Sequence, residues 1–129
     1  MRRVFTLIVA LLTATTLYAQ EPYTVYCTIT GECAAHNPRA TIGTVAIDYG
    51  QQDLRNNDLA DSSGRRLKFQ SMVGAANYLA TYGWELHDSY TSFSPSILES
   101  RMHDKIVTVW ILKKSITSPE EITEGIFTR

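Results

Sequence analysis

Cys27 and Cys33 are the only two cysteines in the chain, and in an oxidising compartment such a pair favours a disulfide. Six steps along an extended strand would place their Cα atoms about 20 Å apart, whereas a disulfide needs about 6 Å. A bridge therefore requires the chain to turn at Thr30-Gly31. The alternative is that Cys27 is a small core side chain and Cys33 is a thiol in a loop.

The histidines raise the question of a metal site. His87-Asp88 and His103-Asp104 stand on either side of one segment, and two imidazoles with a carboxylate can bind zinc. The chain has no His-Glu-x-x-His or Cys-x-x-Cys spacing, and adjacent residues on a strand point to opposite faces. We therefore interpret both histidines as surface residues at strand ends, and we expect no cofactor.

Sequence motifs of catalysis are missing as well. The chain has no Gly-x-Ser-x-Gly elbow, phosphate-binding loop or dinucleotide-binding fingerprint. Acidic residues such as Glu85 and Glu99 could serve acid-base chemistry, but among polar loop residues they more often form a solvated face. The sequence favours a non-catalytic protein. The alternative is a small hydrolase or metal-dependent enzyme that uses His87, His103 and nearby carboxylates.

Four aromatic residues suggest recognition: Trp84, Tyr90, Phe93 and Trp110. On an open sheet face they would form a binding surface that stacks on sugars or anchors a protein, because Trp and Tyr dominate binding hot spots. The alternative is that they fill the core, since a domain of this size needs several large side chains. We expect a binding or envelope-interaction module whose partner is a protein or a glycan.

Alternating apolar and polar residues predict the strands that position these cysteine, histidine and aromatic side chains. Tyr23 to Ile29 is predicted to be the first strand, followed by a connection through residues 31–40. A second strand is expected from Thr41 to Tyr49, with an interruption at Gly43-Thr44 that suggests a bulge. The polar stretch from Gln51 to Arg66 is expected to be the least ordered, with a turn at residues 61–64.

A hairpin is predicted from Trp84–Thr91 and Lys105–Lys113, with the turn near residues 92–96. Its second strand is apolar at nearly every position, so it should be central in the sheet or covered on both faces.

Two helices are expected from local capping signals. Ser71 can cap a helix that continues to Tyr82, where Gly83 would end it. Near the C-terminus, the sequence from Ser118 to Glu121 matches a capping box with proline at the first helical position, which predicts a short helix to about Glu124. The fold class is therefore α+β: an antiparallel sheet of about four strands, one main helix on one face, and a short C-terminal helix.

Four short runs of sequence between residues 69 and 114 together resemble a known type of domain. The runs are Phe69-Gln70-Ser71-Met72, Ala76-Asn77-Tyr78-Leu79, Gly83-Trp84-Glu85-Leu86 and Trp110-Ile111-Leu112-Lys113-Lys114. Together these resemble a family of small exported bacterial domains in which a helix leads through glycine into a tryptophan-bearing strand, followed by a strand that ends in lysine. The resemblance implies one helix against an antiparallel sheet, and no catalytic residues.

Residues 1–19 resemble a cleavable signal peptide. Arg2 and Arg3 precede an apolar run, and Ala19 offers a small residue at the expected cleavage point. The apolar run is too short to span a membrane, so no membrane span is expected after signal cleavage. No cysteine is placed for lipid attachment. We expect a single α+β domain over residues 20–129 that is periplasmic or secreted.

The charge balance restricts the partners. Removing Arg2 and Arg3 leaves ten of the twelve basic residues against thirteen acidic ones, a net charge of −3. The basic residues are not clustered as nucleic acid binding would require, so no nucleic acid partner is expected.

Overall fold

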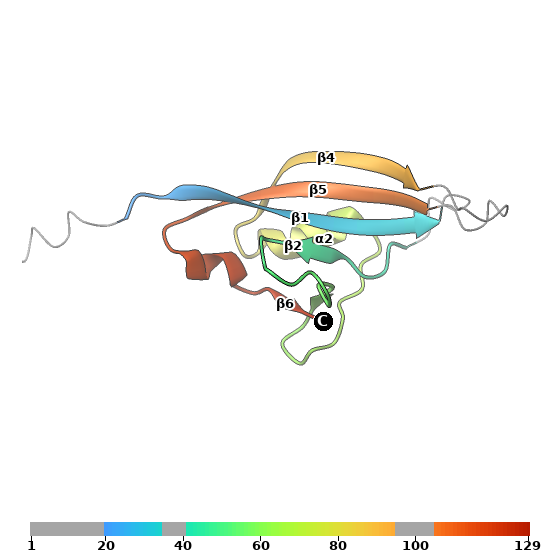
Figure 1. Ribbon diagram of the computed structural model, residues 1–129, viewed down its shortest axis with the longest axis horizontal. Coiled ribbons are helices and arrows are strands. Elements are labelled where there is room, and N and C mark those ends of the chain that lie inside the picture. Colours follow the sequence, from blue (N-terminus) through green and yellow to red (C-terminus); the bar gives the residue numbers. More distant parts are fainter. Residues whose placement is uncertain (1–19, 35–40, 95–104) are drawn as a thin grey trace, which may run out of the picture.

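The computed structural model describes residues 20–34, 41–94 and 105–129. Within them, a four-stranded antiparallel sheet has the strand order β2-β1-β5-β4, and a two-stranded sheet pairs β3 with β6 (Figure 1). The elements are β1 (Tyr23–Ala34), β2 (Ala46–Asp48), β3 (Leu59–Ala60), α2 (Met72–Ala80), β4 (Glu85–Ser94), β5 (Lys105–Ile116), the 3₁₀ helix η3 (Pro119–Thr123) and β6 (Phe127–Thr128). The predicted α+β class is confirmed.

β1 and β5 form the centre of the large sheet. They pair along their whole length, from Tyr23 opposite Ile116 to Ala34 opposite Lys105. The predicted loop beginning at Gly31 is wrong over its first four residues, which continue the strand. Gly31 lies against α2: a Cβ atom there would lie 2.7 Å from the Met72 Sδ, so the Met72 side chain would have to shift. Glycine inside a strand often marks such a close approach.

The predicted hairpin is confirmed as the antiparallel pair β4 and β5, with Glu85 opposite Lys113 at one end. The register shifts between Leu86 and Asp88, so His87 is the extra residue of a β-bulge. β5 has β1 on one side and β4 on the other, as the apolar sequence of this strand predicted. The predicted turn is wrong at residues 92–94, which continue β4 because they pair with β5, and residues 95–96 lie outside the described residues.

The segment between β1 and α2 differs most from expectation. Only Ala46–Asp48 of the predicted second strand is a strand, because Gly43 has a φ of 71° and forms an isolated bridge with Phe69. The polar stretch that we expected to be least ordered contains β3, whose Leu59 is fully buried. The Leu59 N–H donates to the Val45 carbonyl at 2.8 Å, which holds this stretch against β2.

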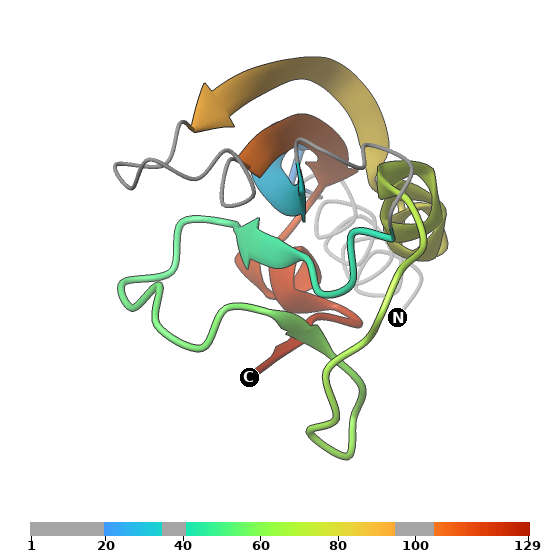
Figure 2. The same cartoon turned by 90° about the vertical axis from the view of Figure 1, so that its right-hand side faces the viewer.

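α2 confirms the predicted main helix. The Ser71 hydroxyl accepts the Gly74 N–H at 3.3 Å, as an N-cap should. The side chains of Met72, Ala75 and Leu79 are buried, which fixes the face that packs on the sheet. Figure 2 shows α2 on one side of the strands.

The C-terminal segment, with η3 and β6, packs against the large sheet and lies below it in Figure 1. η3 has the predicted capping box at Ser118, although it is a 3₁₀ helix and not an α-helix. Gly125 follows with a φ of 73°, and the Tyr82 ring occupies the space that a Cβ atom would need. Ile126 is then buried in the core, and β6 pairs with β3.

One hydrophobic core lies between the large sheet, α2 and the C-terminal segment. Its buried members come from nearly every element: Cys27, Ile29, Val45, Ile47, Leu59, Met72, Ala75, Leu79, Trp84, Leu112 and Ile126.

Candidate functional site

The two faces of the large sheet have different surroundings. On β5, Leu112 belongs to the core and Trp110 packs against it, so the even-numbered side chains point toward α2. The odd-numbered residues of β5 point the opposite way, because side chains alternate along a strand. We call this second surface of β1, β5 and β4 the outer face. In Figure 1 it is seen from the side opposite α2, and no described helix crosses it.

An apolar stripe runs along the middle of the outer face. It consists of Val107, Val109 and Ile111 of β5, and Val109 is buried although it does not belong to the core cluster. By register, Val109 lies between Thr30 of β1 and Tyr90 of β4. These neighbours flank Val109 within the sheet, and no described helix covers the stripe from above.

An aromatic and polar cluster occupies one end of the outer face. The rings of Tyr26 and His87 meet edge to face with centroids 5.4 Å apart. Beside them, the Lys113 Nζ lies 3.5 Å from a Glu85 carboxylate oxygen, in the register row that includes Tyr26. The bulge in β4 brings His87 to Tyr26 across β5, since bulges re-aim side chains.

The aromatic residues predicted from the sequence do not share one surface. Tyr90 lies on the outer face and is 56% exposed. Trp84 is 2% exposed, and Trp110 faces the core from the opposite side of the sheet. The side chain of Phe93 lies outside the described residues. Trp84 and Trp110 therefore cannot form one exposed surface with Tyr90, because the core needs large side chains directly after α2 and in the central strand.

Sequence reasoning missed Tyr26 and the apolar stripe as surface features, and it placed His87 at the surface without its contact with Tyr26. Placing Val25, Cys27 and Ile29 on the core face already implies that Tyr26 points outward. The alternation of β5 is hidden because both of its faces are apolar. The position of His87 depends on the bulge, which leaves no clear signal in the sequence.

The possible disulfide is not present: Cys27 and Cys33 are both free, as in the alternative interpretation. They lie on the continuous strand β1, which does not turn at Thr30-Gly31, so an extended segment separates the two thiols. Cys27 is buried, and this burial, aided by the charge of Asp48, raises the pKa of its thiol to about 12. Cys27 is therefore a core side chain and not a nucleophile.

The metal hypothesis depends on His87 and His103. His87 lies on the outer face, and His103 lies outside the described residues. Within the described part of the chain, no three His, Cys, Asp or Glu side chains come together in a group that could hold a metal ion. The hydrolase alternative stays a prediction without a described site.

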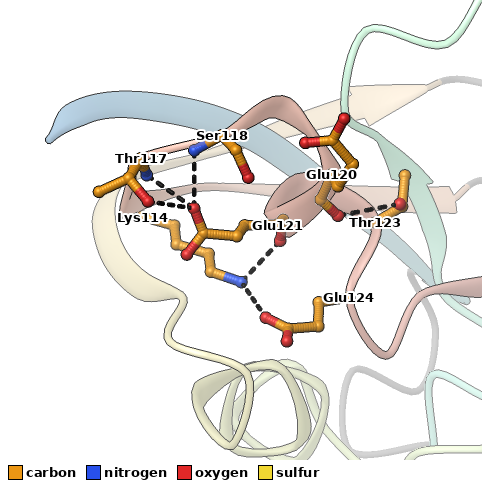
Figure 3. Close-up of polar contacts among 7 residues, drawn as sticks. All are labelled: Lys114, Thr117, Ser118, Glu120, Glu121, Thr123 and Glu124. Atoms are coloured by element: carbon orange, nitrogen blue, oxygen red, sulfur yellow. Dashed lines mark hydrogen bonds and ion pairs between the residues drawn. The ribbon is translucent and has the colours of Figure 1, made fainter. Parts of the chain in front are cut away.

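Lys114 is the one buried charged residue in the described ranges. Figure 3 shows its Nζ donating to the Glu121 carbonyl oxygen at 2.8 Å and lying 3.5 Å from a Glu124 carboxylate oxygen. The ammonium also lies 5.8 Å from the centre of the Trp84 ring. The ammonium on β5 is thus bound by two groups at η3, the Glu121 carbonyl and the Glu124 carboxylate, and Lys114 attaches η3 to β5.

Glu121 completes this attachment. Its carboxylate accepts the backbone N–H of Thr117 at 2.7 Å and that of Ser118 at 2.8 Å, and the Thr117 hydroxyl at 3.0 Å (Figure 3). These hydrogen bonds, chiefly the backbone N–H of Thr117, lower the pKa of Glu121. The cluster is a structural anchor for the C-terminal segment, and the outer face is the stronger candidate for a functional site.

No protein family, curated protein or solved structure matches this chain. The resemblance of about residues 48–114 to a family of small exported bacterial domains therefore stays a prediction.

None of the helices in residues 20–34, 41–94 and 105–129 has the length and apolar character needed to cross a membrane.

Proposed function

We propose that this protein is an exported, non-catalytic binding module that holds a partner protein on its outer face. The observation that supports this most directly is β5. It is apolar on both faces, and on the face away from α2 Val107 and Ile111 are only half-buried, beside the exposed rings of Tyr26 and Tyr90. Apolar surface left open and rimmed by polar residues is typical of interaction sites.

The composition of the outer face favours a protein over a glycan as the partner. Val107 and Ile111 provide partly exposed aliphatic surface, which suits apolar side chains better than a sugar ring. Tyr26 and Tyr90 stand at its borders, more than half exposed, where aromatic anchors contribute most to protein binding. The paired charges of Lys113 and Glu85 form part of a polar rim.

Export is the second part of the proposal and rests on residues 1–19. Fractionation of cells that produce the full chain should place the protein outside the cytoplasm. Its intact mass should correspond to a chain that begins near Gln20. Retention in the cytoplasm with an uncleaved N-terminus would contradict export and leave the proposed binding face open to a separate test.

Site-specific photocrosslinking tests the binding face in living cells. A photoreactive phenylalanine analogue would replace Tyr26 or Tyr90, and matched controls would carry it at Leu54 after β2 or at Val73 on α2, which are 50% and 54% exposed and lie on neither β1, β4 nor β5. We expect one discrete protein adduct from the two outer-face positions and none from the controls. Equal adducts from all four positions, or adducts from the controls alone, would refute the proposal.

A substitution test complements the crosslinking. Tyr90→Ser should abolish the adduct formed from position 26, because it removes an aromatic anchor while leaving the core intact. Val73→Ser is the matched control and should leave that adduct unchanged. Adducts to carbohydrate in place of protein, detected by glycosidase treatment, would contradict the choice of a protein partner.

A further inference from the structure

β4 is an open edge of the large sheet. In the described part of the chain it pairs only with β5, and Figures 1 and 2 show it as the outermost strand. At the opposite edge, β2 is already covered: Ala46 bridges to Asp58, and the Ile47 N–H donates to the Asn57 carbonyl at 2.9 Å. An uncovered edge presents unpaired N–H and C=O groups that can pair with another strand.

The first half of β4 carries features that oppose strand addition. The bulge at His87 interrupts the regular edge, and bulges and charges are common means of protecting an edge. Glu85 and Asp88 add negative charge. The Asp88 carboxylate also accepts the Ser89 N–H at 2.7 Å, which occupies a donor of the strand itself.

The second half of β4 has no such protection. The six residues Ser89–Ser94 read Ser-Tyr-Thr-Ser-Phe-Ser, with no charge, proline or glycine. Uncharged segments with Tyr, Thr and Phe pair readily with other strands. Because the Ser89 N–H bonds to the Asp88 carboxylate, we infer that this N–H points to the open edge of the sheet, away from β5. Backbone N–H groups two residues apart on a strand point to the same edge, so the Thr91 N–H also points to the open edge.

We propose that the second half of β4 pairs with β4 of a second copy, antiparallel, about a two-fold axis near Thr91. With the axis near Thr91, antiparallel pairing sets Ser89–Phe93 of the two copies against each other and keeps the two acidic halves at opposite ends of the contact, whereas a parallel pair would set like charges side by side. A basic foreign strand would be attracted to Glu85 and Asp88, but that half is the protected one. A second copy matches the uncharged half, and the contact closes as an isologous dimer.

This pairing uses the strand edge and not the outer face, so it can hold or fail independently of the partner binding proposed above. The test is sedimentation velocity of the purified protein, produced from the full chain, from about 1 to about 100 μM. We expect a monomer–dimer equilibrium. Thr91→Lys alone and Thr91→Glu alone should each weaken the dimer at least about tenfold, because like charges then face each other near the axis.

Mixing the two variants is the decisive measurement, because opposite charges at position 91 of the two copies should restore the dimer, a result that loss of folding cannot mimic. Val73→Lys on α2 is the matched control and should leave the equilibrium unchanged. A monomer at every concentration, a dimer insensitive to Thr91→Lys, no restoration on mixing, or equal loss in Val73→Lys would each overturn the proposal. So would a monomer that protects its β4 amides from hydrogen exchange only when cell extract is added, which would identify a foreign strand as the occupant.

Discussion

Lys114 and Lys113 are adjacent in sequence but face opposite sides of the sheet. The Lys114 side chain is 7% exposed and its ammonium is bound by Glu121 and Glu124, whereas the Lys113 side chain is 38% exposed and pairs with Glu85. A buried donor that satisfies a part-buried carbonyl contributes more to stability than an exposed ion pair. This difference makes the two lysines a matched pair for mutagenesis.

Lys114→Met should lower the free energy of unfolding by about 1–3 kcal/mol, because the Glu121 carbonyl loses its donor while the apolar stem is retained. Lys113→Met should change it by less than about 1 kcal/mol, since surface ion pairs contribute little. Urea unfolding followed by circular dichroism measures both. Equal losses in the two variants would show that η3 is not anchored by Lys114.

The cysteines give a prediction that follows from burial. Because the pKa of Cys27 is raised to about 12, only roughly 10⁻⁴ of this thiol is ionised at pH 8, and the thiolate is the reactive form. Iodoacetamide should therefore label the half-buried Cys33 first and Cys27 only after unfolding. Peptide mass spectrometry measures the order. Early labelling of Cys27, or a mass lower by two hydrogens before reduction, would contradict the free-thiol structure.

At the scale of elements, capping residues close together in the sequence determine where the two helices begin. Ser71 begins α2, and the capping box begins η3 at Ser118. Both were predictable because the donors and acceptors of a cap lie within three residues of each other. η3 then depends on Glu121, whose carboxylate joins the cap to the end of β5.

The capping role of Glu121 predicts a pH dependence. Its pKa is lower in the folded than in the unfolded chain, so the unfolded state binds the proton first. The stabilisation is present above the unfolded pKa and is lost as the pH falls through the lower, folded pKa. Between pH 7 and about pH 3, the melting temperature should fall more steeply in the wild type than in Glu121→Gln. Parallel curves would mean that Glu121 does not contribute through its charge.

β1 and β5 show the limit of local signals for strands. β1 was expected to end at Ile29, since Gly31 is a poor strand former. It continues because β5 pairs with it up to Ala34, and Gly31 brings it close to Met72 of α2. Such a contact joins residues far apart in the sequence, so no window of neighbouring residues contains it.

At the scale of the whole molecule, the C-terminal segment ties distant parts of the chain together. The Arg129 N–H donates to the Asp58 carbonyl at 3.0 Å, and its guanidinium donates to the Gly64 carbonyl at 3.1 Å. Ile126 adds a buried side chain to the core. The polar stretch after β2 is thereby ordered by contacts with the last residues of the chain.

Ile126→Ala should lower the free energy of unfolding by about 2–4 kcal/mol, because it removes buried aliphatic groups from the common core. Phe127→Ala is the matched control: Phe127 is 47% exposed, so its loss should be below about 1 kcal/mol. Urea titrations of both variants provide the comparison. A larger loss in Phe127→Ala would indicate that the β3–β6 pair, and not the core, fastens the C-terminus.

The sequence by itself determined the α+β class, the main helix from its cap at Ser71, the hairpin of β4 and β5, and the central place of β5. These follow from periodicity and capping, which act between residues close together in the chain. Only the tertiary structure decided that Trp84 is core, that Cys27 and Cys33 cannot meet, and that Tyr26 and His87 share the outer face. Those outcomes depend on which strands become neighbours and which face α2 covers, because burial is set by the packing of distant segments and not by the residue itself.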